Sequence, residues 1–222
     1  MTEFILTTIL LTGKIAAIAT AFALLAGVAA AWAMHRRTFA GRSLIDALLM
    51  LPLVLPPTVL GYYLLTALGR KSPFGRWLEQ TFDIRLIFTW QGAVIAAAIV
   101  AFPLVYQGAR AALAAVDQQL EGAARTLGAG EWRVFVRVTL PLAWPGVLAG
   151  TMLAFARAMG EFGATLMVAG SLPGRTQTLA LAIYDSVQAG RDGEALILVG
   201  VTSLVCVLIL VVAARVLRSR HP

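Results

Sequence analysis

The chain has 222 residues, of which 59% are hydrophobic and only 13% charged, whereas an ordinary soluble domain has roughly 25% charged residues. This composition leaves too few polar side chains to cover a water-facing surface, and it excludes a second, soluble domain. The net charge of +7 would suggest nucleic-acid binding in a soluble protein. Here the basic residues lie between apolar stretches, where they set topology and meet lipid headgroups. We therefore expect an integral membrane protein in a lipid bilayer and no nucleic-acid partner.

Five apolar stretches are long enough to cross a hydrocarbon core of about 30 Å, which takes about 20 helical residues. Backbone N–H and C=O groups must be paired in lipid, so these stretches are predicted to be helices. The expected fold class is an all-α integral membrane protein with about five transmembrane helices in one domain, 4–217. The predicted spans lie near 5–34, 45–68, 86–110, 138–168 and 195–215.

The basic residues between these spans predict the orientation, because cytoplasmic connections carry an excess of Lys and Arg. One side carries ten of them: Arg36, Arg37, Arg42, Arg110, Arg125, Arg133, Arg137, Arg215, Arg218 and Arg220. The other side carries six: Arg70, Lys71, Arg76, Arg85, Arg175 and Arg191. The larger set is expected in the cytoplasm, which places the N-terminus outside and the C-terminus inside.

Prolines mark where the helices are expected to bend, and glycines mark where two helices can pack closely. Pro52, Pro56 and Pro57 fall within the second stretch, and Pro103 is expected to interrupt the third, as is common in transporters whose helices move. Gly146 and Gly150 form a small-xxx-small pair that permits close helix packing.

Two short helices are expected on the outer side. Ser72 as N-cap and Pro73 at the first helical position predict an interfacial helix anchored by Trp77. The segment 178–189 is consistent with either a short helix before Gly190 or an ordered loop.

The cytoplasmic connection between the third and fourth spans, 121–141, has the most regular pattern in the chain. Its apolar residues recur with helical spacing at Leu120, Ala123, Ala124 and Leu127. Glu121 and Arg125 form an acid-to-base pair four residues apart, and Gly128 suits the end of a helix. These features predict a short helix near 117–128 that docks on a partner and passes rigid-body motion to the spans.

This connection resembles the EAA signature of ABC importer permeases, with Gly122 as a departure where many relatives have alanine. The matching positions are Glu121, Ala123, Ala124, Gly128, Val138, Leu140 and Pro141. The resemblance implies a type I importer (MetI-like) permease fold in which 121–128 is the coupling helix. It also implies two copies of an ATPase subunit, a second permease copy, an extracytoplasmic oxyanion-binding protein, and the plasma (inner) membrane of a prokaryote.

The chain itself has no GxxxxGK[ST] pattern to hold ATP phosphates and no nucleophile–base arrangement. His35, His221 and Cys206 are too scattered for a metal site or a disulfide. We therefore expect no enzyme, no catalytic residue and no cofactor in this chain, with ATP and Mg²⁺ on the partner ATPase.

The substrate is indicated by a second resemblance, to molybdate permease subunits, which extends over nearly the whole chain. It rests on Gly160–Ala164 (GEFGA), Pro173–Thr176 (PGRT), Thr178-Leu179 and Ile183-Tyr184. The resemblance implies import of molybdate or the similar tungstate. Sulfate and thiosulfate permeases share GEFG and remain the alternative, as does a pairing of two different permease subunits. A secondary transporter that works without ATP would leave the 121–141 pattern unexplained. The five predicted spans also show no internal inverted repeat of the kind found in many such transporters.

Arg157 and Glu161 are predicted inside the fourth span, where charged side chains are costly and often functional. They are four residues apart and can pair on one helical face. They are candidates either for a gate on the transport path or for a structural pair that locks adjacent helices. We favour the structural pair, because a carboxylate on the path would repel a dianion.

Overall fold

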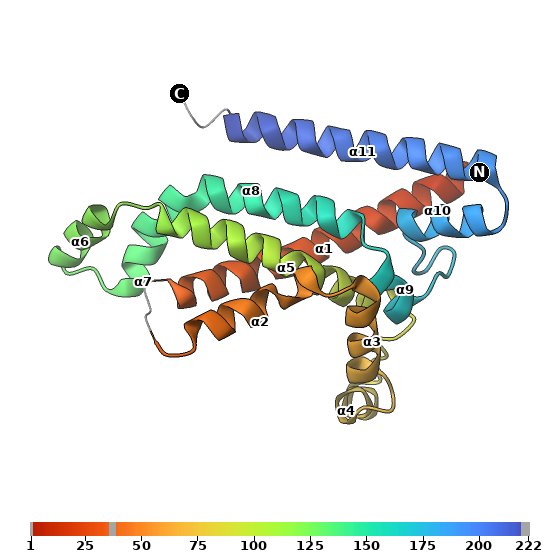
Figure 1. Cartoon of the computed structure of the whole chain (residues 1–222), viewed down its shortest axis with the longest axis horizontal. Coiled ribbons are helices and arrows are strands. Elements are labelled where there is room, and N and C mark those ends of the chain that lie inside the picture. The colour runs from red at the N-terminus through yellow and green to blue at the C-terminus, as the bar shows by residue number, and fades with distance from the viewer. Residues whose placement is uncertain (1, 36–38, 219–222) are drawn as a thin grey trace.

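The structure is a computed structural model that describes residues 2–35 and 39–218, with side chains over 3–35 and 39–211. Regular structure in these residues is entirely helical (Figure 1). In chain order the helices are α1 (Thr2–Met34), α2 (Arg42–Val54), α3 (Pro57–Leu68), α4 (Pro73–Phe82), α5 (Trp90–Ala114), α6 (Gln118–Thr126), α7 (Glu131–Val134), the π-helical turn η1 (Phe135–Thr139), α8 (Leu140–Met159), α9 (Gly163–Ala169), α10 (Leu179–Gln188) and α11 (Asp192–Arg218). Of the residues used above to predict orientation, Arg36, Arg37 and Arg220 lie outside the described part, as does His221.

Four helical runs among the described residues are long and apolar enough to cross a membrane: α1, α5, α11 and the continuous run from α7 through η1 to α8. They extend along the long axis of the molecule in Figure 1, with α6 and α7 at one end and the N-terminus and α10 at the other. A fifth crossing is formed only if the bent pair of α2 and α3 is one span. The expected all-helical membrane fold is confirmed.

The second predicted span is sharply bent rather than straight. Helices α2 and α3 meet at 106°, and Leu55 between them is extended, with φ −65° and ψ 139°. Pro56 and Pro57 explain the bend, because a proline excludes the helical conformation for the residue before it and has no N–H to donate. Pro52 lies within α2 without ending it. In Figure 1, α3 and α4 project away from the bundle.

The prediction that Pro103 interrupts the third span is wrong, since α5 is continuous from Trp90 to Ala114. One missing N–H bends a helix without ending it where neighbouring helices support both sides, and Pro103 is buried. The span also begins later than predicted. Thr89 is the N-cap, and its hydroxyl accepts a hydrogen bond from the Gly92 N–H at 3.2 Å.

The fourth predicted span, 138–168, is wrong at both ends. The helical run begins earlier, at Glu131, and ends at Met159, so Glu161 lies beyond the end of the helix. Residues 160–162 separate α8 from α9. The reason is local: Gly160 and Gly163 flank the break, and glycine stabilises helices poorly.

The two interrupted helical segments, α2–α3 and α8–α9, lie against each other through α3 and α9. A Cβ atom at Gly163 of α9 would come within 2.8 Å of the Pro57 Cβ in α3, and one at Gly61 of α3 within 2.7 Å of the Met167 Cβ in α9. Both glycines are therefore required by close approach of the two helices. The bend at Pro56 and the break after α8 form one joint.

The core around α5 is built from small residues. A Cβ at Gly108 of α5 would lie 2.9 Å from the Gly150 Cα of α8, and one at Gly146 would lie 2.6 Å from the Ala112 Cβ. The close packing predicted for Gly146 and Gly150 is thus confirmed, and its partner is α5. Helices in lipid gain most from such close backbone approach, because there is no hydrophobic difference between lipid and protein interior.

Helix α1 extends beyond its uncharged stretch, 15–34, which at 1.5 Å per residue covers about 30 Å. Lys14 lies just before that stretch, with its ammonium 3.9 Å from the centre of the Trp90 ring. This cation–π contact lies at the first residue of α5 and at the start of the uncharged stretch of α1. The preceding turns of α1 pack their apolar residues on α10 and α11, and Thr12 accepts a hydrogen bond from the Leu179 N–H at 2.9 Å.

Both short outer helices are present. In α4 the Ser72 hydroxyl accepts a hydrogen bond from the Gly75 N–H at 2.8 Å, which confirms the predicted N-cap. The segment 178–189 is a helix, α10, and Gly190 after it has φ +68°.

Candidate functional site

Helix α6 begins and ends as its sequence predicts. The Asp117 carboxylate accepts a hydrogen bond from the Gln119 N–H at 2.8 Å. At the other end Gly128 has φ +79°, its N–H donates to the Arg125 carbonyl at 2.9 Å, and the Ala129 N–H donates to the Ala124 carbonyl at 3.1 Å. This pair of bonds is a Schellman motif, which needs a residue that tolerates the left-handed conformation. The helix is therefore fixed at both ends.

The charged face of α6 points into the protein. Glu121 is only 1% exposed, and its Oε1 accepts a hydrogen bond from the Thr139 hydroxyl at 2.7 Å. Its Oε2 lies 3.4 Å from Nη2 of Arg125. The same Arg125 donates to both carboxylate oxygens of Glu131, at 2.5 and 3.0 Å. Hydrogen bonding to Glu131 raises the pKa of the Arg125 guanidinium, which therefore stays charged at every accessible pH.

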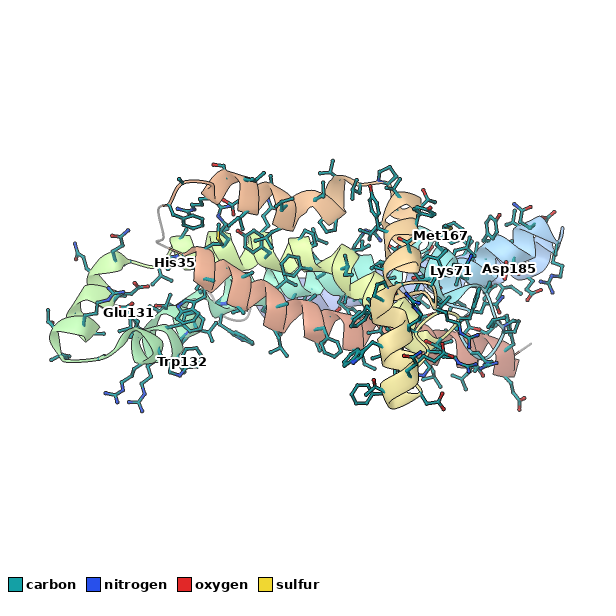
Figure 2. All side chains as sticks on the ribbon, turned by 90° about the horizontal axis from the view of Figure 1, so that it is seen from below. His35, Lys71, Glu131, Trp132, Met167 and Asp185 are labelled. Atoms are coloured by element: carbon teal, nitrogen blue, oxygen red, sulfur yellow. The ribbon has the colours of Figure 1, made fainter. Side chains whose placement is uncertain are left out.

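The charged face of α6 also lies beside the C-terminal end of α1. His35 places Nε2 4.0 Å from Oε1 of Glu121, and the Trp32 ring packs on Phe135 of η1 with 4.9 Å between centroids. A cavity of about 290 Å³ lies among these groups, and it is lined by Trp32, Ala33, His35, Glu121, Arg125, Glu131, Val134, Phe135 and Thr139. Figure 2 shows His35, Glu131 and Trp132 together at this end of the molecule. The cluster joins α1, α6, α7 and η1.

The apolar face of α6 points outward, which is the reverse of an ordinary surface helix. Leu127 is 88% exposed and Leu120 is 50% exposed. A groove of about 460 Å³ separates this face from the start of α8, and its lining residues are Leu120, Ala123, Ala124, Leu127, Arg137, Val138, Pro141 and Leu142. Exposed apolar grooves of this kind are often binding surfaces for other proteins.

The residues predicted to act in coupling thus divide into two groups. Ala123, Ala124, Leu127, Val138 and Pro141 line the groove. Glu121 faces inward, Gly128 caps the helix, and Leu140 packs on a buried cluster at the inner end of α1 and α5. The second group thus holds α6 in place within this chain, whereas the first group lines the exposed groove.

Arg157 and Glu161 are paired, with 2.8 Å between Nη1 and Oε2. Glu161 is 2% exposed, and its Oε1 also accepts a hydrogen bond from the Ala164 N–H at 2.9 Å. The carboxylate therefore ties the last turn of α8 to the first turn of α9. Oε1 is hydrogen-bonded within this joint and Oε2 is held there by the ion pair with Arg157, which supports the structural alternative.

Three functional features were missed from the sequence. Thr139, between two signature residues, gave no signal because a buried threonine is ordinary in an apolar stretch. Asp46 of α2 accepts a hydrogen bond from the Tyr106 hydroxyl and pairs with Arg110 at 2.9 Å; the spacing of these residues in the chain hides the contact. Trp132 is exposed beside the inner cluster.

The PGRT turn lies at the opposite, outer end. Gly174 has φ +70°, and the buried Thr176 hydroxyl accepts from the Leu172 N–H at 3.1 Å and lies 3.2 Å from the Gly170 carbonyl. Arg175 thereby lines an outer cavity of about 870 Å³ together with Lys71. Figure 2 shows Lys71 and Asp185 at this end.

Comparison with known proteins agrees with this geometry. Residues 23–221 match the family described as "Binding-protein-dependent transport system inner membrane component". Over 189 residues, covering 84% of this chain and 82% of the relative, the sequence is 49% identical to the molybdenum transport system permease protein ModB of Escherichia coli (strain K12). It is 46% identical over 187 residues, with the same coverage of both chains, to a putative molybdenum transport system permease protein, YvgM, of Bacillus subtilis (strain 168).

A sulfate transport system permease protein, CysT of Escherichia coli (strain K12), is 38% identical over 162 residues, which are 73% of this chain and 58% of that protein. Among solved structures, the fold resembles a chain of a bacterial alginate ABC transporter with a TM-score of 0.78 at 16% identity, covering 100% of this chain and 82% of that one. A chain of the MetNI methionine ABC transporter gives a TM-score of 0.74 at 15% identity, with 99% and 97% covered. On the match over 23–221, this chain belongs to the family of inner membrane components of binding-protein-dependent transport systems.

Proposed function

We propose that this chain is the membrane-spanning permease subunit of an ATP-driven importer for molybdate or tungstate. The observation that carries the proposal is the reversed α6, which turns its apolar face and the adjoining groove outward at the inner end of the bundle. A helix held rigidly by buried charges, with an exposed apolar face, suits docking of a separate subunit that moves. The substrate in this proposal is inferred from the similarity to the molybdenum transport permease proteins described above.

The complete transporter contains, in this proposal, two copies of an ATPase subunit, two copies of the permease and an extracytoplasmic oxyanion-binding protein. ATP and Mg²⁺ reside on the ATPase, and this chain supplies no catalytic group. The α6 end faces the cytoplasm of a prokaryote and the α10 end faces outward. Each ATPase copy takes Leu120 and Leu127 of one permease into an apolar cleft.

The decisive test is uptake into proteoliposomes that contain this chain, its ATPase and its binding protein. We expect ATP-dependent accumulation of labelled molybdate that tungstate competes for and a large excess of sulfate does not. Uptake dominated by sulfate would keep the permease function and replace the substrate, which the sulfate transport relatives make the second candidate. Uptake that continues without ATP would overturn the proposal.

A further inference from the structure

Thr139 is the residue that the signature leaves unspecified, between Val138 and Leu140. Its side chain is buried, at 3% exposure, and its hydroxyl donates to the Glu121 carboxylate at 2.7 Å. A hydrogen bond to a charged acceptor in a buried site is about twice as strong as a neutral one. It joins α6 directly to the helical run that crosses the membrane as α8.

Thr139 is also the last residue of η1, a π-helical turn within an otherwise α-helical run. The Leu140 N–H donates to the Phe135 carbonyl, five residues earlier. Pro141 explains the turn: it has no N–H, and its ring would clash with the carbonyl four residues before it. Such turns inside long helices bend more readily than α-helix and recur at functional sites. The bond between Thr139 and Glu121 therefore attaches α6 to the end of this π-helical turn, immediately before α8.

A second side-chain link between α6 and this run, the Arg125–Glu131 pair, is more exposed to solvent. Arg125 pairs with Glu131, but the Glu131 side chain is 70% exposed, and exposed ion pairs contribute little because water and salt screen them. The backbone link between α6 and α7 is the short stretch 128–130, which the Schellman motif holds at the α6 end. The buried Thr139–Glu121 bond joins α6 directly to the end of η1, and it is better shielded from water than the Arg125–Glu131 pair.

We propose that Thr139 is a positioning residue that couples motion of α6 to α8, so that ATP hydrolysis and opening of the transport path remain linked. The bond fixes the docked helix to the pliable turn, and without it α6 follows the ATPase while α8 does not. This inference rests on the proposed function, because it requires an ATPase partner at α6.

The test uses the complete transporter in proteoliposomes and measures molybdate taken up per ATP hydrolysed. Thr139→Val keeps the shape of the side chain and removes the donor, and we expect its uptake per ATP to fall about tenfold, as expected for a lost bond to a charged group. Thr139→Ser restores the donor and should return the ratio to within about twofold of the parent. Thr151→Val on the same helix is the matched control, since the Thr151 hydroxyl donates only to the Val147 carbonyl of its own helix.

An unchanged ratio in Thr139→Val would overturn the inference, and so would a Thr139→Ser variant as uncoupled as Thr139→Val. Loss of ATPase co-purification in Thr139→Val would also overturn it, because the bond would then support assembly and not coupling. Failure of the parent transporter to take up molybdate would instead contradict the proposed function. The two failures are thus distinguishable in one set of vesicles.

Discussion

Glu121 and Glu161 are both almost fully buried, yet each accepts hydrogen bonds and faces a basic side chain. Burying a carboxylate is costly unless its lone pairs are used. Their position at the two ends of α8 is informative. Glu121 accepts a hydrogen bond from Thr139, immediately before α8, and Glu161 links Arg157 in the last turn of α8 to the first turn of α9.

Removing the Glu161 side chain is expected to loosen the joint between α8 and α9. Glu161→Ala leaves the Arg157 guanidinium and the Ala164 N–H without their acceptor, and we expect a loss of roughly 3 kcal/mol of stability. The midpoint of thermal unfolding of the purified protein in detergent measures it. Glu3→Ala, at an exposed position on α1, is the control and should leave the midpoint unchanged.

The gate alternative for Glu161 is tested with Glu161→Gln. The glutamine can still accept from the Ala164 N–H, so we expect normal assembly and near-normal molybdate uptake per ATP. Uptake abolished in a fully assembled Glu161→Gln transporter would show that the charge itself acts on the transport path, and it would contradict the structural interpretation.

The outer segment contains a pH-sensitive ion cluster. Glu79 of α4 accepts hydrogen bonds from Arg70, at 2.8 and 2.6 Å, and from Arg85 at 2.9 Å. The Arg70 hydrogen bonds lower the pKa of the Glu79 carboxyl below 4.5. A lowered folded-state pKa means that the contribution to stability is complete above the unfolded value and disappears as the pH falls through the folded value.

Amide hydrogen exchange over α4 should therefore accelerate as the pH drops below 4.5, after correction for the intrinsic pH dependence. Glu79→Gln should remove this acid-dependent acceleration and show the faster exchange already at neutral pH. High salt should weaken the effect because the cluster is exposed. Identical pH profiles for the parent and Glu79→Gln would refute the assignment.

Helix α6 buries its charged face and exposes its apolar face, and this arrangement predicts the effect of surface substitutions. Leu127→Asp places a charge on the face proposed to enter a partner, and we expect at least about tenfold weaker association with the ATPase, with no change in the folding of this chain. Gln119→Ala, exposed on the flank of the same helix, is the matched control. Co-purification and thermal unfolding measure the two effects separately. Full association of Leu127→Asp would place the partner elsewhere.

Much of the helix pattern could be predicted because local chemistry decides it. Ser72 caps the start of α4 with its hydroxyl, and Gly128 closes α6 because glycine tolerates a positive φ. The apolar stretches had to be helical in lipid. The errors occurred at prolines. Pro103 permits a continuous helix, whereas the consecutive Pro56 and Pro57 accompany a bend of 106°. The sequence shows the paired prolines, but it does not show the neighbouring helices that support α5 around Pro103.

The candidate site was predictable in its residues but not in its orientation. Helical spacing places Leu120 and Leu127 on one face of α6 and Glu121 with Arg125 on the other. Which face turns inward depends on Thr139 and His35, from distant segments. A helix with an apolar stripe is ordinarily expected to bury it, so only the tertiary structure shows that the charged face is the buried one.

At the scale of the whole molecule, charge and architecture agree on two distinct ends. Arg110, Arg125 and Arg137 lie at the end that contains α6, where α11 also finishes. Arg70, Lys71 and Arg175 line the cavity at the opposite end. The four helical runs between these ends each have at least the roughly 20 residues that a bilayer requires. From this distribution the positive-inside rule predicts that α6 lies in the cytoplasm.

This orientation predicts which single cysteines react from outside the cell. In a Cys206→Ala background, Gln80→Cys on α4 should react with a membrane-impermeant maleimide in intact right-side-out vesicles. Ala129→Cys, after α6, should react only once the vesicles are permeabilised. Neither substitution alters a buried side chain, so folding is preserved. The reverse labelling pattern would invert the topology and leave α6 out of reach of ATP. Such an outcome would remove the physical basis for coupling at this helix, because the docking face and the nucleotide would lie on opposite sides of the membrane.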